Sequence, residues 1–173
     1  MGESPTPESG RRPDAIAARV RHRVGMRSKS TAPEAPARRR ILIVDNHALV
    51  RRGLTALIDN EADLTVCAAV ATQEAGLEAI ATCRPDLVIT DLVLDDGDGL
   101  DLVRDIRAGH EDLPVLVLTM HDAPVHARRA FRAGARGYVS KPELGETLLL
   151  AIRCVLGGEK FVSPMLREGL SFE

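Results

Sequence analysis

The chain has 173 residues, of which 45% are hydrophobic but only 2% aromatic, and its formal net charge is -2. This length fits one domain with an attached segment, and the composition indicates a core of aliphatic side chains. No apolar run reaches the roughly 18 to 20 residues of a membrane span and no signal peptide is recognisable, so we expect a cytoplasmic protein without a membrane partner.

Charge divides the chain into two parts. Residues 1–40 hold 10 Lys+Arg and 4 Asp+Glu, whereas the remaining residues hold 13 and 21. Residues 1–39 are rich in Pro, Ser, Glu and Arg, which predicts a disordered basic tail. The run Arg38-Arg39-Arg40 has no aromatic interleaving, so a solvated tail is favoured over a nucleic-acid arm. Met26 is an alternative start of the natural protein.

From residue 40 onward, short apolar runs alternate with segments of helical periodicity. Thr72 and Asp98 are predicted helix N-caps, and Leu49, Leu54 and Leu57 fall near one face of the first helix. The predicted strands cover residues 41–45, 64–70, 86–91, 114–120 and 136–140, and the predicted helices cover 47–60, 72–83, 99–109, 123–134 and 143–158.

This alternation predicts an α/β fold with a five-stranded parallel sheet and helices on both faces. In such open sheets, ligands bind beyond the carboxyl ends of the strands, near the point where the strand order switches. Functional residues are therefore expected directly after the strands.

Polar residues do follow the predicted strands. Asp45 and Asn46 end the first, Asp91 the third and Thr119 the fourth, while Lys141 follows the fifth. Clustered carboxylate and amide oxygens suit Mg²⁺, and a hydroxyl beside an ammonium can hold phosphoryl oxygens. The combination favours the transfer of a phosphoryl group.

Four segments in this order resemble the receiver domain of bacterial two-component response regulators, a flavodoxin-like or CheY-like fold, especially the NarL/LuxR type. They are VDNHALVRRGL, PDLVITDLVLDDGDGL, VLVLTMHD and AGARGYVSKP, and the resemblance covers about residues 40 to 160. It implies a receiver domain over 40–158 that accepts a phosphoryl group from a sensor histidine kinase.

The resemblance also implies roles for single residues. Asp91 matches the phosphorylated aspartate, and Asp45 and Asn46 match the acidic pair that holds Mg²⁺, with the backbone carbonyl of Val93 as a further ligand. Thr119 matches the switch hydroxyl.

Two further matches lie in the last motif. Lys141 matches the family's lysine, followed by a proline at a bond that is usually cis, and Tyr138 matches the aromatic switch. Asn46 departs from the family, which usually has a second acid there, so weaker Mg²⁺ binding is expected. Asp95 stands where a proline is common and could partly restore the negative field.

Several alternatives stay open. A pseudo-receiver would act by protein contact without phosphorylation, and Asn46 favours it. An aspartate-nucleophile phosphohydrolase would need a second acid two positions after Asp91, where Val93 stands. Tyr138 could equally be an edge-strand packing residue, and Asn46 a turn residue.

Other patterns indicate no site. A calcium loop is disfavoured because Leu100 occupies a ligand position of the run that begins DDGDG. The histidines at 47, 121 and 126 lack ligand spacing and are expected at the surface, and the odd set Cys67, Cys83 and Cys154 indicates reduced core thiols.

The resemblance implies partners as well. Homodimers are expected through the first and fifth helices, or through the fourth helix, fifth strand and fifth helix. Residues 159–173 resemble the linker that leads to a helix-turn-helix output domain, which lies outside this sequence. The folded part is acidic, so we expect specific DNA binding only through such a domain.

Overall fold

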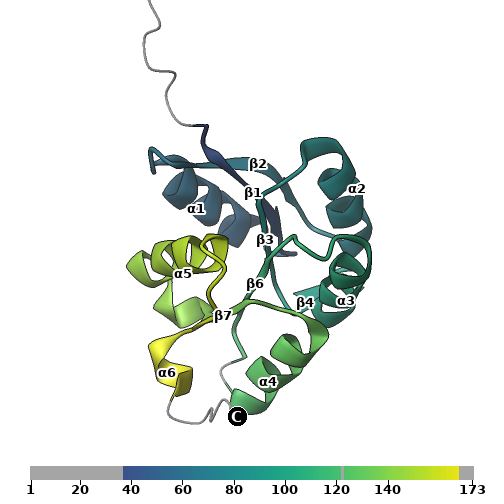
Figure 1. Cartoon of the computed structure of the whole chain (residues 1–173), viewed down its shortest axis with the longest axis vertical. Coiled ribbons are helices and arrows are strands. Elements are labelled where there is room, and N and C mark those ends of the chain that lie inside the picture. The colour runs from purple at the N-terminus through teal and green to yellow at the C-terminus, as the bar shows by residue number, and fades with distance from the viewer. Residues whose placement is uncertain (1–36, 122, 168–173) are drawn as a thin grey trace, which may run out of the picture. The chain divides into compact units, whose positions relative to one another are not determined.

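Parallel strands alternate with helices in the computed structural model, which describes residues 37–121 and 123–167 (Figure 1). Residues 1–36 of the predicted disordered tail lie outside this range, whereas residues 37–39 are described and Arg39 begins the first strand. The strands are β1 Arg39–Val44, β2 Leu64–Val70, β3 Leu87–Thr90, β4 Val93–Leu94, β5 Gly97–Asp98, β6 Val115–Thr119, β7 Gly137–Ser140 and β8 Phe161–Val162. The helices are α1 Ala48–Asp59, α2 Gln73–Cys83, α3 Gly99–Gly109, α4 Pro124–Ala133, η1 Lys141–Glu143 (a 3-10 helix), α5 Glu146–Leu156 and α6 Pro164–Arg167.

The main sheet has the strand order β2-β1-β3-β6-β7-β8, and every neighbouring pair in it is parallel. The predicted α/β fold is confirmed, but the sheet has six strands instead of five. The extra strand, β8, pairs Phe161 with Gly137 and Val162 with Tyr138. A two-residue strand carries no periodic pattern, so its segment resembled a linker although both side chains are only 4% exposed.

Alternating side chains of the central strands build two cores. In β1, Ile41 and Ile43 face the cluster under α1 and α5, whereas Leu42 and Val44 face the cluster under α2, α3 and α4. Figure 1 shows α1 and α5 together on one side of the sheet and α2, α3 and α4 on the other side. Both faces are covered, which explains why the strands read as continuous apolar runs.

The helix starts follow the predicted capping chemistry. The Thr72 hydroxyl accepts a hydrogen bond from the Ala75 backbone N–H, and the Asp98 carboxylate accepts one from Leu100. Leu49 departs from the prediction, because its side chain is 82% exposed while Leu54 is buried. It lies five residues before Leu54, which places it about 140° away around the helix. Its side chain therefore points away from the core, whereas Val50 of the same turn packs against it.

The loop after β3 forms a small structure of its own. Val93–Leu94 and Gly97–Asp98 pair as an antiparallel hairpin where only a turn was expected. Its Asp96 carboxylate accepts hydrogen bonds from the backbone N–H groups of Gln73 and Glu74 at the start of α2. The Gln73 bond is the main reason that the pKa of Asp96 lies below its ordinary value. The hairpin is thereby tied to the neighbouring helix.

Candidate functional site

The two acids that follow β1 and β3 lie on neighbouring strands. Val44 pairs with Thr90, so Asp45 and Asp91 emerge at the same edge of the sheet. The Asp91 backbone N–H donates to the Val44 carbonyl at 2.9 Å, which extends the ladder to the last residue before the loop. Because the strand order reverses between β1 and β3, the pair also marks the switch point of the sheet.

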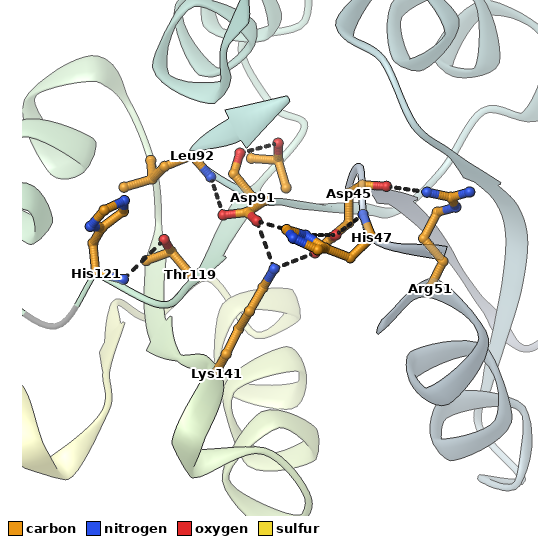
Figure 2. A network of polar contacts seen from close by, with 9 residues as sticks. Asp45, His47, Arg51, Asp91, Leu92, Thr119, His121 and Lys141 are labelled. Carbon is orange, nitrogen blue, oxygen red and sulfur yellow. Dashed lines mark hydrogen bonds and ion pairs between the residues drawn. The ribbon is translucent and has the colours of Figure 1, made fainter. Parts of the chain in front are cut away.

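Lys141 joins these acids, as the sequence predicted for this edge. Its ammonium Nζ lies 2.6 Å from Asp91 Oδ2 and 2.7 Å from Asp45 Oδ2 (Figure 2). The contact to Asp91 is a hydrogen bond, whereas the contact to Asp45 is an ion pair without hydrogen-bond geometry. All three residues are less than 10% exposed, so water screens their charges weakly.

The Asp91 carboxylate is held from a second side. Its Oδ1 accepts a hydrogen bond of 2.6 Å from the backbone N–H of Leu92, which leaves Oδ2 toward Lys141. The start of α3 presses against the same loop, since a Cβ on Gly99 would lie only 1.9 Å from the Asp91 carbonyl oxygen. Only glycine fits there, so α3 defines the position of the loop that carries Asp91.

Thr119 and Tyr138 converge on one backbone segment. The Thr119 hydroxyl accepts a hydrogen bond of 3.2 Å from the backbone N–H of His121, and the Tyr138 hydroxyl donates one of 2.6 Å to the His121 carbonyl. Tyr138 is fully buried in a hydrophobic cluster, and β7 lies between β6 and β8, so this residue packs in the core but not on an edge strand. The segment after β6 is therefore anchored by two side chains, one from its own strand and one from the next.

Two buried oxygen atoms at the end of β1 have no hydrogen-bond partner among the residues that the structure describes. They are the Asn46 amide oxygen Oδ1 and Asp45 Oδ2, and the latter makes an ion pair with Lys141. Buried polar atoms of this kind need a partner. Carboxylate and amide oxygens are ligand types that suit Mg²⁺. Val93, the other predicted contributor, begins β4 two residues after Asp91.

His47 belongs to this site, although its spacing gave no signal in the sequence. Its side chain is 60% exposed, as expected for a surface histidine, but Nδ1 lies 3.2 Å from Asp45 Oδ1 and 3.9 Å from Asp91 Oδ2. One ligand atom each from Asp45, His47 and Asp91 lie within 4.8 Å of one another. The close approach depends on the turn after β1, which periodicity does not reveal.

A cleft of about 840 Å³ lies at the opposite, amino edge of the sheet. Its lining includes Arg39 and Asp86, which are paired with each other at 3.1 Å and are both partly exposed. Large volume alone does not make a reactive site, and the buried charges gather at the carboxyl edge instead. We therefore assign the chemistry to the carboxyl edge.

Comparison with known proteins identifies the family of this chain. The family model for the response regulator receiver domain matches residues 41–153. The oxygen regulatory protein NreC of Staphylococcus epidermidis is 33% identical over 132 residues, which cover 76% of this chain and 61% of that protein. The response regulator GacA of Pseudomonas viridiflava is 30% identical over 78% of this chain and 63% of its own length. The chain thus spans less than two thirds of these curated relatives.

Solved structures give the same result. A two-component response regulator of the LuxR family from Aurantimonas superposes with a TM-score of 0.73 at 33% identity, over 76% of this chain and 94% of that one. The isolated receiver domain of RcsB from Salmonella enterica superposes with a TM-score of 0.72 at 22% identity, over 78% of this chain and all of that one, which shows the shared fold.

The chain therefore belongs to the response regulator receiver domains, of the NarL/LuxR type, and proteins of this family serve signalling. None of the helices in the described part of the chain has the length and apolar character needed to cross a membrane.

Proposed function

We propose that this domain accepts a phosphoryl group on Asp91 from a sensor histidine kinase and changes its surface in response, to control transcription. The observation that carries the proposal is the buried contact of Lys141 with both Asp91 and Asp45 at the switch point of the sheet. An ion pair that only stabilises the fold needs one acid and one lysine, and not two acids from different strands. A phosphoryl-transfer site needs a cation close to the attacking carboxylate, because the phosphoryl oxygens carry negative charge.

The transfer follows from the way Asp91 is held. The Leu92 N–H binds Oδ1 and the Lys141 ammonium binds Oδ2, so the carboxylate has a defined orientation. One carboxylate oxygen attacks phosphorus while the phosphorus–nitrogen bond to the donor histidine breaks, and an acyl phosphate forms. The transition state is loose, so the protein contributes mainly positioning and charge stabilisation. Lys141 supplies part of that charge next to the reacting oxygen.

We propose that Asp45, Asn46, Asp91 and the backbone carbonyl of Val93 hold Mg²⁺. When bound, this ion neutralises charge on the transferring phosphoryl oxygens. The buried amide oxygen of Asn46, which lacks a partner, supports its role as a ligand. Because Asn46 is neutral, the oxygen set carries one negative charge fewer than an acidic pair would, and weaker Mg²⁺ binding is expected.

Thr119 and Tyr138 are the proposed switch. The Thr119 hydroxyl can donate a hydrogen bond to a phosphoryl oxygen on Asp91, because β6 neighbours β3. Movement of Thr119 alters its contact with the His121 N–H, and the Tyr138 hydroxyl holds the carbonyl of the same residue. Phosphorylation thus biases the segment that joins β6 to α4 and changes the surface there.

We also propose the organisation of the whole protein. The residues before β1 act as a basic tail, the receiver extends from β1 to β8 and α6, and the residues after α6 lead toward a helix-turn-helix output domain that binds DNA in a homodimer. The relatives, which are longer than this chain, support a further domain. A cytoplasmic location is proposed, because a sensor kinase would deliver its phosphoryl group there.

The test is the intact mass of the protein after incubation with acetyl phosphate or phosphoramidate, with and without Mg²⁺. We expect a Mg²⁺-dependent gain of one phosphoryl group, which Asp91→Ala abolishes. Asp112→Ala removes an exposed acid elsewhere and serves as the control, with the gain unchanged. Phosphorylation of the Asp91→Ala protein would overturn the proposal.

The neutral side chain of Asn46 favours a second candidate function, that of a pseudo-receiver that acts by protein contact without phosphorylation. No mass gain with either donor, from a protein that is folded by circular dichroism, would favour this candidate. Restoration of the gain by Asn46→Asp would then identify the missing negative charge as the cause, because that change returns an acid to the oxygen set.

A further inference from the structure

His47 makes an interaction that its place in α1 does not require. It is the N-cap residue of α1, yet its side chain makes no capping hydrogen bond to the helix. Instead, Figure 2 shows the imidazole ring turned toward the carboxylates of Asp45 and Asp91. The Nδ1 atom lies 3.2 Å from Asp45 Oδ1, and the backbone N–H of His47 donates to the same oxygen at 2.7 Å. Two groups of one residue therefore face one carboxylate.

The position of the ring suits a metal ligand. Nitrogen and carboxylate oxygens from Asp45, His47 and Asp91 approach one another within 4.8 Å. The ring is 60% exposed while both acids are buried, so it stands between the site and solvent. The donor set thus combines two carboxylates and one imidazole nitrogen. Asn46, between Asp45 and His47 in the chain, has a buried amide oxygen without a hydrogen-bond partner among the described residues.

The ligand types of this set differ from those that Mg²⁺ prefers. Mg²⁺ takes oxygen ligands and keeps several waters, so an imidazole adds little to its binding. The divalent ions from Fe²⁺ to Zn²⁺ accept imidazole nitrogen readily, and Mn²⁺ stands at the weak end of the same affinity order. Compared with an acid at this position, the neutral amide of Asn46 lowers the electrostatic attraction for every divalent ion. The nitrogen of His47 compensates for this loss only with the transition-metal ions.

We propose that His47 is a metal ligand at this site and that it gives the domain a preference for divalent transition-metal ions over Mg²⁺. The inference deepens the proposed function, because it concerns the metal that assists the same phosphoryl transfer. The neutral imidazole binds through Nδ1, and any proton on that nitrogen leaves or moves to Nε2.

The test uses Mn²⁺, whose electron paramagnetic resonance spectrum reports both binding and ligand type. Loss of the free-ion signal on titration measures affinity, and electron spin-echo modulation detects a directly bound ¹⁴N. For the unchanged protein we expect binding to one site with nitrogen modulation, and Mg²⁺ should compete weakly. His47→Ala should remove the modulation and lower Mn²⁺ affinity about tenfold or more, while Mg²⁺ affinity changes less than about twofold.

Two controls locate the effect. His110→Ala removes an exposed histidine at the amino edge and should leave both affinities unchanged. Asp91→Ala should lower Mn²⁺ affinity, which places the ion at this edge of the sheet. Binding of Mn²⁺ without nitrogen modulation, or equal loss of Mn²⁺ and Mg²⁺ affinity in His47→Ala, would overturn the inference. In either case Mg²⁺-dependent phosphorylation of Asp91 would still stand as a separate result, so failure of the two proposals can be distinguished.

Discussion

The two edges of the sheet differ in how deeply their charged side chains are buried. At the carboxyl edge, Lys141 contacts Asp45 and Asp91, and all three are buried. At the amino edge of the same strands β1 and β3, Arg39 pairs with Asp86 at 3.1 Å, with much of both side chains in water. Buried charges without a cation are costly, whereas exposed pairs contribute little. Burial of Asp45, Asp91 and Lys141 is therefore not explained by a gain in stability, which points to a functional role for these three charges.

The two ends of α3 sharpen this comparison. Gly99 begins the helix against the Asp91 loop, whereas Gly109 ends it with nothing within 4 Å of an added Cβ. We expect Gly99→Ala to destabilise the protein by about 3 kcal/mol or more, because the methyl group overlaps a backbone oxygen. Gly109→Ala should change stability by less than about 1 kcal/mol, in the favourable direction.

Urea unfolding of both variants measures this contrast, and phosphoryl acceptance should fall only in Gly99→Ala. Equal stability of the two variants would mean that α3 can move away from the Asp91 loop at little cost.

Removing the cation at each edge tests the comparison directly. Lys141→Met leaves two buried carboxylates close together without a positive charge, and we expect a loss of about 3 kcal/mol. Arg39→Met removes a partly exposed partner and should cost less than about 1 kcal/mol. Unfolding midpoints in urea at neutral pH give both values. Similar losses in the two variants would show that burial of the charges at the carboxyl edge is energetically unimportant.

A smaller effect is expected for a second ion pair near the amino edge. The hydrogen bond from Arg153 is the main reason that the pKa of Asp63 lies below its ordinary value. This pair is largely exposed, so its contribution is less than about 1 kcal/mol. A lowered carboxyl pKa stabilises the fold above the ordinary value near 4, and the contribution is lost as the pH falls through the lower, folded-state pKa.

The stability difference between the unchanged protein and Asp63→Asn should therefore be present at pH 7 and shrink as the pH drops below about 4. It should also shrink in 1 M salt, where exposed charges are screened. Asp112→Asn provides an exposed acid without this partner as the control. A difference that persists at low pH would show that Asp63 acts through packing and not through its charge.

The central strands and the residues behind them were predictable from local patterns. Four consecutive aliphatic residues, Ile41 to Val44, identify a strand covered on both faces, and Asp45 and Asp91 follow such strands directly. Parallel strands end at one edge, so the meeting of these acids with Lys141 follows from topology. The N-caps Thr72 and Asp98 were likewise visible, because capping depends on neighbours two or three residues away.

Other features lacked a local signal. The strand Phe161–Val162 is too short to show periodicity. It forms because it supplies backbone hydrogen-bond partners to the side of β7 away from β6 and buries both of its side chains. The exposure of Leu49 depends on which face of α1 turns toward the sheet. The ring of His47 reaches two acids because the turn after β1 directs it there, and this direction depends on backbone geometry that spacing does not encode.

The sequence alone thus determined the fold class, the order of the five longer strands along the chain and the meeting of Asp45, Asp91 and Lys141 at the carboxyl edge, because each depends on short-range periodicity or on residue type. Only the tertiary structure decided which charges are buried, which glycine touches the Asp91 loop and how close His47 comes to the acids. Those features arise from contacts between segments far apart in the chain, and their strength depends on distances and burial that no linear pattern contains.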